Sequence, residues 1–137
     1  MTPSAPHAHV VVRTAADEVV LIRRVRHGRV YYVAPGVEVG PGETPGGAAA
    51  RAARDELGLE TAIEEMLYAQ VFAGVDHFFF LASTESELDG AGIVPARDDF
   101  ELGTELGGSY EIALLPLRAL LGYDVRPWAL AQRVTRM

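Results

Sequence analysis

The sequence predicts one α/β domain, built on a mixed β-sheet with helices on both of its faces. Three observations indicate this fold class. β-rich runs form hairpins in both halves of the chain, an alanine-rich helical segment stands between the halves, and two helical segments follow the last β-rich run. The 137 residues contain no repeat, low-complexity segment or linker, so we treat residues 1–137 as a single domain.

The first half opens with a predicted hairpin. The runs 7–14 (HAHVVVRT) and 18–25 (EVVLIRRV) are rich in β-branched residues, and the short segment 15–17 turns between them. A third strand is expected at 29–34 (RVYYVA). The loop 35–43 that follows holds three glycines and two prolines, so its backbone can approach a ligand closely.

A helix is predicted from Pro45 to Leu57. Thr44 is suited to capping its N-terminus, Pro45 fits the first helical position, and Gly58 is a natural C-terminal stop.

The second half repeats the hairpin pattern. Strands are expected at 62–73 (AIEEMLYAQVFA) and 76–82 (DHFFFLA), and a last strand at 109–117 (SYEIALLPL) precedes helices at 117–122 and 126–136. Residues 84–108 are acidic, contain glycines and lack periodicity. A loop of that length in a compact domain is usually functional or mobile.

Composition excludes several classes of function. The net charge of −7 argues against polymeric nucleic acid and against an anionic membrane as partners. The absence of cysteine excludes thiolate metal sites and a cysteine nucleophile. We find no membrane-span-length apolar run, signal-peptide pattern, P-loop or Gly-x-Gly-x-x-Gly motif, and we expect a cytoplasmic protein.

The charges on the predicted helix are the main candidates for chemistry. On an ideal α-helix Asp55 and Glu56 lie on the same face as Ala52, and two neighbouring carboxylates beside a glycine-rich loop suit a hard divalent cation and a phosphate. Arg51 lies one turn before Asp55 and can orient it, while Glu43 complements the positive helix terminus. The alternative is a solvated acidic stripe with one i,i+4 ion pair.

Residues 37–59 resemble the Nudix box, which reads Gly, five residues, Glu, seven residues, then Arg-Glu-aliphatic-any-Glu-Glu-any-Gly-aliphatic. Glu43, Arg51, the acidic pair Asp55-Glu56 and the final Gly58-Leu59 match it. Three positions depart from it: Val37 replaces the first glycine, Ala52 replaces the glutamate after the arginine, and Asp55 replaces a glutamate. The resemblance extends over roughly residues 10–120 and implies a Nudix-type α/β/α sandwich.

The resemblance also implies roles for individual residues. Mg²⁺ or Mn²⁺ would be bound by Asp55, Glu56 and the Gly36 carbonyl, with Glu56, Arg51 and Glu43 as the catalytic set. Arg24 is the match for an arginine that holds substrate phosphate. The glutamate missing at Ala52 is commonly a metal ligand or the base. A carboxylate of the long loop often completes such a site; the candidates, which are equally consistent with a solvated acidic loop, are Asp98, Asp99, Glu101 and Glu105.

Outside the box, each candidate carries a functional and a structural interpretation. The basic cluster of the second strand either contacts phosphate or is solvated surface (Arg23, Arg24, Arg26, His27 and Arg29). His7 and His9 have metal-ligand spacing but lie near the terminus, and His77 is a general-base candidate for which the sequence identifies no partner. The aromatic residues either stack a base or fill the core (Tyr31, Tyr32, Phe72 and Phe78 to Phe80).

The sequence therefore predicts a Nudix hydrolase that cleaves a nucleoside diphosphate linked to another moiety, using divalent metal and water. Two alternatives remain open. One is a Nudix-fold domain with impaired catalysis that binds a nucleotide or a protein, and the other is a hydrolase whose base comes from outside the box. The expected partner is a small-molecule nucleoside diphosphate derivative, and the sequence leaves a homodimer open.

Overall fold

The computed structural model describes residues 5–85 and 109–136 of the chain. Strands β1 (His7–Arg13), β2 (Glu18–Arg26), β3 (Arg29–Val33) and β4 (Gly36–Glu38) precede helix α1 (Pro45–Ala52) and a π-helical turn (Ala53–Leu57). Strands β5 (Ala62–Phe72), β6 (Val75–Ser83) and β7 (Ser109–Pro116) follow, and then a 3₁₀ helix (Leu117–Gly122), strand β8 (Val125–Arg126) and helix α2 (Trp128–Thr135).

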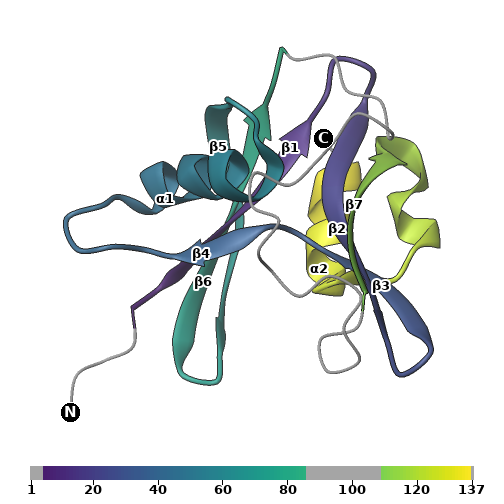
Figure 1. Cartoon of the computed structure of the whole chain (residues 1–137), viewed down its shortest axis with the longest axis horizontal. Helices are drawn as coiled ribbons and strands as arrows, with labels where there is room; N and C mark the ends of the chain where they lie inside the picture. The colour runs from purple at the N-terminus through teal and green to yellow at the C-terminus, as the bar shows by residue number, and fades with distance from the viewer. Residues whose placement is uncertain (1–4, 86–108, 137) are drawn as a thin grey trace.

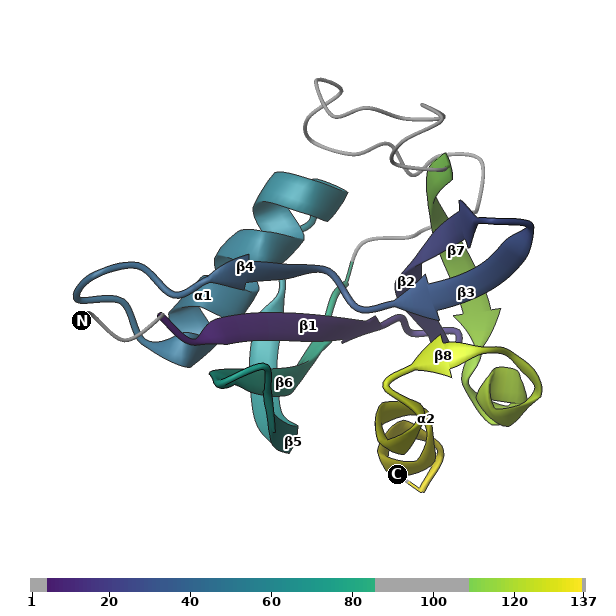
Figure 2. The same cartoon turned by 90° about the horizontal axis from the view of Figure 1, so that it is seen from below.

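The strands form one mixed sheet in the order β5-β6-β1-β2-β3-β8, with β4 pairing β1 and β7 pairing β2. The β1–β6 and β3–β8 pairs are parallel, and the other pairs are antiparallel. Figures 1 and 2 show α1 and α2 on opposite sides of the strands. The predicted α/β/α arrangement with a mixed sheet is confirmed.

Side-chain alternation along β1 divides the core into two clusters. Val10 and Val12 pack with the alanines of α1, while Val11 packs with Leu130 and Val134 of α2. The α1 face is built on methyl groups, because Ala48, Ala49, Ala52 and Ala53 are all fully buried against the sheet. Small side chains at these positions let the helix axis approach the strands closely.

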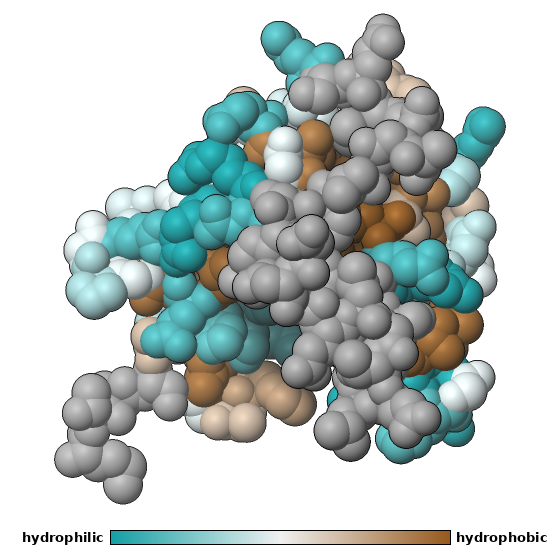
Figure 3. All heavy atoms as spheres, viewed as in Figure 1, coloured by the Kyte–Doolittle hydropathy of each residue, from teal (hydrophilic) through white to brown (hydrophobic). Residues whose placement is uncertain are grey.

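The helix expected at 45–57 is present, but its last turn is not α-helical. Thr44 caps the N-terminus by accepting a hydrogen bond from the Gly47 amide at 3.0 Å. From Ala53 to Leu57 the chain widens into a π-turn, and Gly58 ends it with a φ of 70°, the left-handed conformation that glycine adopts without strain. Figure 3 shows hydrophilic residues gathered on the surface over α1 and the loop before it.

Two short strands were missed by the sequence analysis. β4 lies inside the glycine-rich loop and pairs with β1, and β8 pairs with β3 just before Pro127, whose peptide bond is cis. Each is too short to show the alternation of apolar and polar residues by which a strand is recognised in a sequence. Among the described residues, no helix has the length and apolar character needed to cross a membrane.

Candidate functional site

A bidentate ion pair between Glu43 and Arg51 fixes the glycine-rich loop to the helix. Arg51 Nε donates to Glu43 Oε2 at 3.0 Å and Nη2 donates to Oε1 at 2.9 Å. Nη2 also donates to the Glu38 carbonyl at 2.9 Å, and Glu43 Oε1 accepts from the Gly40 amide at 2.9 Å. The pair therefore ties four points of the chain together, from β4 to the last turn of α1.

The pKa values of Glu43 and Arg51, the ion pair called the clamp from here on, agree with its geometry. The hydrogen bonds from Arg51, followed by the one from the Gly40 amide, lower the pKa of Glu43 from 4.5 to about 2. The same carboxylate raises the pKa of Arg51. Both side chains are thus charged throughout the physiological range.

The acidic pair lies on the π-turn. Asp55 Oδ2 is 3.8 Å from Arg51 Nη1, its side chain is half exposed, and Glu56 is partly buried. Ala52, by contrast, is fully buried in the α1 core cluster. The structure thus differs from the ideal-helix expectation for Asp55: the helix widens directly after Ala52, and the half-exposed Asp55 does not share a solvent-facing side with the fully buried Ala52.

Among the described residues, no three His, Asp or Glu side chains are grouped so that they could hold a metal ion. Asp55 and Glu56 supply two carboxylates, and the Gly36 carbonyl is a main-chain oxygen of β4. The four loop acids named above, Asp98, Asp99, Glu101 and Glu105, lie outside the described residues.

Arg24 lies on β2, partly buried, opposite Tyr31 of β3. By strand alternation it shares the face of Val20 and Ile22, which pack against α1. Arg126 of β8 places its guanidinium 4.2 Å from the centre of the Tyr31 ring. Two arginines therefore flank one tyrosine. Elsewhere in the basic cluster Arg23 pairs with Glu111 at 3.2 Å, while Arg26, His27 and Arg29 are exposed.

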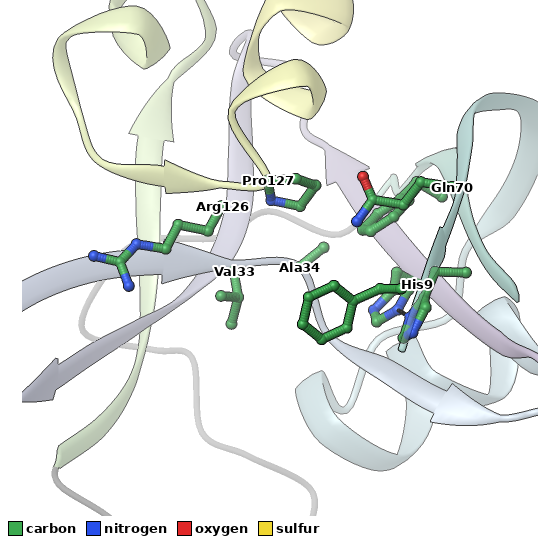
Figure 4. Close-up of a pocket in the computed structure, with 9 residues that line it drawn as sticks. His9, Val33, Ala34, Gln70, Arg126 and Pro127 are labelled. Atoms are coloured by element: carbon green, nitrogen blue, oxygen red, sulfur yellow. Dashed lines mark hydrogen bonds between the residues drawn. The ribbon is translucent and has the colours of Figure 1, made fainter. Parts of the chain in front are cut away.

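A cavity of about 380 Å³ opens where β1 and β6 part from β3 and β8, within the size range of small-molecule sites. Figure 4 shows its labelled residues converging from the two halves of the sheet, with the Arg126 head group directed away from His9 and Gln70. The lining is largely apolar: His9, Val33, Ala34, Gln70, Phe72, His77, Phe79, Arg126 and Pro127.

Two cross-strand rows form one side of this cavity. Gln70 of β5 is opposite His77 of β6, and Phe79 of β6 lies between Tyr68 and His9 in the same way. His9 stacks on Phe79 with ring centres 4.4 Å apart. Of the aromatic residues weighed in the sequence, Phe79 and Phe80 pack in the core, whereas Phe72 is two-thirds exposed at the cavity.

The structure gives His77 the partner that the sequence did not identify. His9 Nε2 and His77 Nδ1 are 2.9 Å apart, and the His7 ring centre lies 5.0 Å from that of His77. The signal in the sequence was the His-x-His alternation of 7 and 9, which puts both rings on one face of β1. The parallel pairing that brings His77 beside them joins residues almost 70 positions apart and has no local signal.

Comparisons with known proteins were made for the sequence and for the fold. Curated protein sequences give no match. A NUDIX-family hydrolase from Clostridium perfringens superposes with a TM-score of 0.69 at 14% identity, covering 99% of this chain and 98% of that one. The Nudix hydrolase RenU from M. smegmatis gives 0.67 at 20% identity, covering 99% and 86%. An Ap4A hydrolase from C. elegans, in a binary complex, gives 0.65 at 15%, covering 95% and 93%.

At these identities the solved structures establish the fold alone. The family follows from the sequence, because the family model described as NUDIX domain matches residues 3–103, well over half of the chain. This span includes the loop, the clamp and the acidic pair described above, and the chain belongs to the NUDIX domain family.

Proposed function

We propose that this protein is a divalent-metal-dependent hydrolase that cleaves a nucleoside diphosphate linked to another group. The observation that carries the proposal is the Glu43–Arg51 clamp, which holds the glycine-rich loop against the helix that bears Asp55 and Glu56. A fixed loop with main-chain donors and acceptors beside two carboxylates suits a metal-bound diphosphate.

The donor set fits a hard cation such as Mg²⁺ or Mn²⁺. Asp55, Glu56 and the Gly36 carbonyl offer oxygen atoms only, and such ligands favour these ions over softer metals. A bound ion would neutralise phosphate charge and activate water. Arg51 and Glu43 orient the loop and helix, Glu56 is the candidate base, and Arg24 is the candidate phosphate contact on the same face of the sheet.

The cavity beside His9 and His77 is the proposed site for the organic part of the substrate. It has apolar walls with few polar groups, as in sites that bind flat organic ligands. Its lining residue His9 lies against Gly36, the first residue of β4, and β4 leads directly into the clamped loop. Diphosphate and organic group would thus bind on two sides of the same short strand.

The test is product formation across a panel of nucleoside diphosphate derivatives, with Mg²⁺, with Mn²⁺ and with chelator. We expect metal-dependent release of a nucleoside monophosphate from at least one substrate, and its loss in the Asp55→Ala/Glu56→Ala double variant. Glu64→Ala/Glu65→Ala is the matched control, because both residues are exposed acids on β5. Activity that survives removal of the acidic pair would refute the assigned metal site.

A second candidate function is nucleotide or protein binding without hydrolysis. The buried alanine at position 52 favours it, since the family's glutamate is absent there and its place is taken by a core methyl group. Under this alternative the wild-type protein and the Asp55→Ala/Glu56→Ala variant bind nucleoside diphosphates with the same affinity. Neither protein releases product with Mg²⁺ or with Mn²⁺.

A further inference from the structure

The side of the cavity formed by β5 and β6 carries two polar side chains, Gln70 and His77, directly opposite each other in the antiparallel pair. Side chains in such positions are about 5 Å apart at Cβ, a spacing that lets both contact one planar group. What they present to a ligand is decided by the hydrogen bonds each already makes.

The hydrogen bond to His9 determines which ring nitrogen of His77 can contact a ligand. His9 Nε2 lies 2.9 Å from His77 Nδ1, and the backbone carbonyl of Ala34 acts on the same ring as a hydrogen-bond acceptor, for which Nδ1 is the remaining nitrogen. A carbonyl only accepts, so this arrangement favours the tautomer of His9 that has its proton on Nδ1 and an acceptor at Nε2. In that tautomer the proton between the two rings belongs to His77 Nδ1, and His77 Nε2 is left as a hydrogen-bond acceptor.

The charge state of the pair is consistent with this chain of bonds. Burial, followed by repulsion from His77 and His7, lowers the pKa of His9 to about 4. Burial is also the first cause of the lowered pKa of His77; His7 acts in the same direction, and Asp76 opposes it. At neutral pH both rings are uncharged, as a donor–acceptor chain of two imidazoles requires.

A hydrogen bond within β5 determines which atoms of the Gln70 amide can contact a ligand. The Tyr68 hydroxyl donates to Gln70 Oε1, so the amide oxygen is engaged and the NH₂ group is available as a donor. In Figure 4 the Gln70 nitrogen lies on the side of Ala34 and the oxygen lies away from it. No hydrogen bond to His77 Nε2 or Gln70 Nε2 occurs within residues 5–85 and 109–136.

We propose that Gln70 and His77 are specificity-determining residues that recognise the edge of a nucleobase, with His77 Nε2 accepting from the base and the Gln70 amide donating to it. This rests on the proposed function in one respect, namely that the cavity takes the organic part of the substrate. His9 is the positioning residue, because it sets which nitrogen of His77 is free. An amino group or ring N–H beside a ring nitrogen or carbonyl matches this pair.

The rest of the cavity favours a flat heterocycle over a sugar. Val33, Ala34 and Pro127 offer apolar walls, and the exposed Phe72 ring lies at the same cavity. A hydroxyl-rich ring would lose water against these walls without enough partners, whereas a base buries its faces and directs its polar edge to the two side chains.

The test measures binding of nucleosides without phosphate, by NMR titration of metal-free protein with adenosine, uridine, guanosine and cytidine. Purine riboside and 3-methyluridine are the matched analogues that lack the edge donor of adenosine and uridine. We expect at least one of the four to bind, and its donor-deleted analogue to bind about fivefold more weakly, the equivalent of one hydrogen bond between neutral groups. If guanosine or cytidine binds best, 1-methylguanosine or N4,N4-dimethylcytidine replaces the analogue.

His77→Phe should remove this preference, so that nucleoside and analogue bind alike, and His77→Gln should restore part of it through the amide oxygen. Nitrogen chemical shifts of the His77 ring should show the Nδ1–H form in the wild type and a larger Nε2–H population in His9→Phe. His7→Gln is the matched control, since His7 belongs to the same cluster but does not line the cavity.

Absence of binding by all four nucleosides, or a donor preference that persists in His77→Phe, would overturn the proposal. Because no probe carries phosphate and no metal is present, failure of the hydrolase assay leaves this result intact, and failure here leaves metal-dependent hydrolysis to be judged separately.

Discussion

The imidazole of His9 lies directly over the α-carbon of Gly36, so that a Cβ added to Gly36 would stand 2.2 Å from His9 Nδ1 and 2.6 Å from Cε1. Gly36 is paired with His9 across β1 and β4, and the absence of a side chain is what lets the ring lie flat there. This contact links the wall of the cavity to the first residue of the strand that leads into the clamped loop.

Gly36→Ala should therefore destabilise the protein by about 1–3 kcal/mol, the usual cost of forcing extra volume into a packed site. Denaturant unfolding checks the value. Gly122→Ala is the control, because a Cβ there meets nothing within 4 Å and its backbone is not in the left-handed region. Combining Gly36→Ala with His9→Ala should cost less than the sum of the two single changes, since the clash is gone. Strict additivity would show that the ring is not the obstacle.

Folding stability should fall as the pH drops from about 6.5 to about 4. The pKa of His9 is lowered from 6.5 in the reference state to about 4 in the fold, so in this window the unfolded chain binds a proton that the folded chain does not. The full shift corresponds to about 3 kcal/mol at most. His9→Phe keeps a flat ring over Gly36 and should flatten this part of the stability profile.

The comparison for that experiment is His7→Gln, which should leave the slope between pH 6.5 and 4 intact. Glu43 contributes in a separate, lower window, because its pKa is lowered to about 2 and its stabilisation is lost only as pH falls below about 4.5. An unchanged slope in His9→Phe would mean that His9 is not the titrating group.

The clamp predicts that lysine cannot replace Arg51 without loosening the glycine-rich loop. Arg51 makes three hydrogen bonds, to both oxygens of Glu43 and to the Glu38 carbonyl, and a single ammonium group cannot reproduce this planar geometry. Arg51→Lys should loosen the loop, with faster hydrogen exchange at the Gly40 amide and a lower turnover number on any substrate found. Arg54→Lys, at an exposed position one turn later, should change neither quantity.

Local signals in the sequence were enough to predict most of the fold. The cap at Thr44, the stop at Gly58 and the β-rich runs each depend on residues a few positions apart, and all appear where they were expected. The π-turn, β4 and β8 depend on tertiary packing and were not predicted.

The candidate site likewise contains features that the sequence predicted and features that it did not. The box spacing identified Glu43 and Arg51 as site residues, but it paired Arg51 with Asp55, and the bidentate pair between Glu43 and Arg51 is seen only in the structure. The His9–His77 chain was not predicted, because it depends on the parallel register of β1 and β6, and no periodicity within either strand encodes that register. Ideal helix geometry placed Ala52 on the face of the acidic pair, but its side chain is fully buried in the α1 core cluster, and the helix widens directly after it.

The burial of Ala52 leads to the last prediction, for Ala52→Glu. The Ala52 side chain is fully buried in the cluster that includes Val10 and Val12, so a glutamate must displace core contacts or bury a carboxylate. We expect a loss of about 3 kcal/mol or more in unfolding free energy and no gain in hydrolysis, with or without Mn²⁺. Ala50→Glu, at a partly exposed position of the same helix, should cost much less. The opposite outcome is equally clear: if Mn²⁺ restored the melting temperature of Ala52→Glu and hydrolysis rose, residue 52 would face the metal, and the substitution would have rebuilt the box.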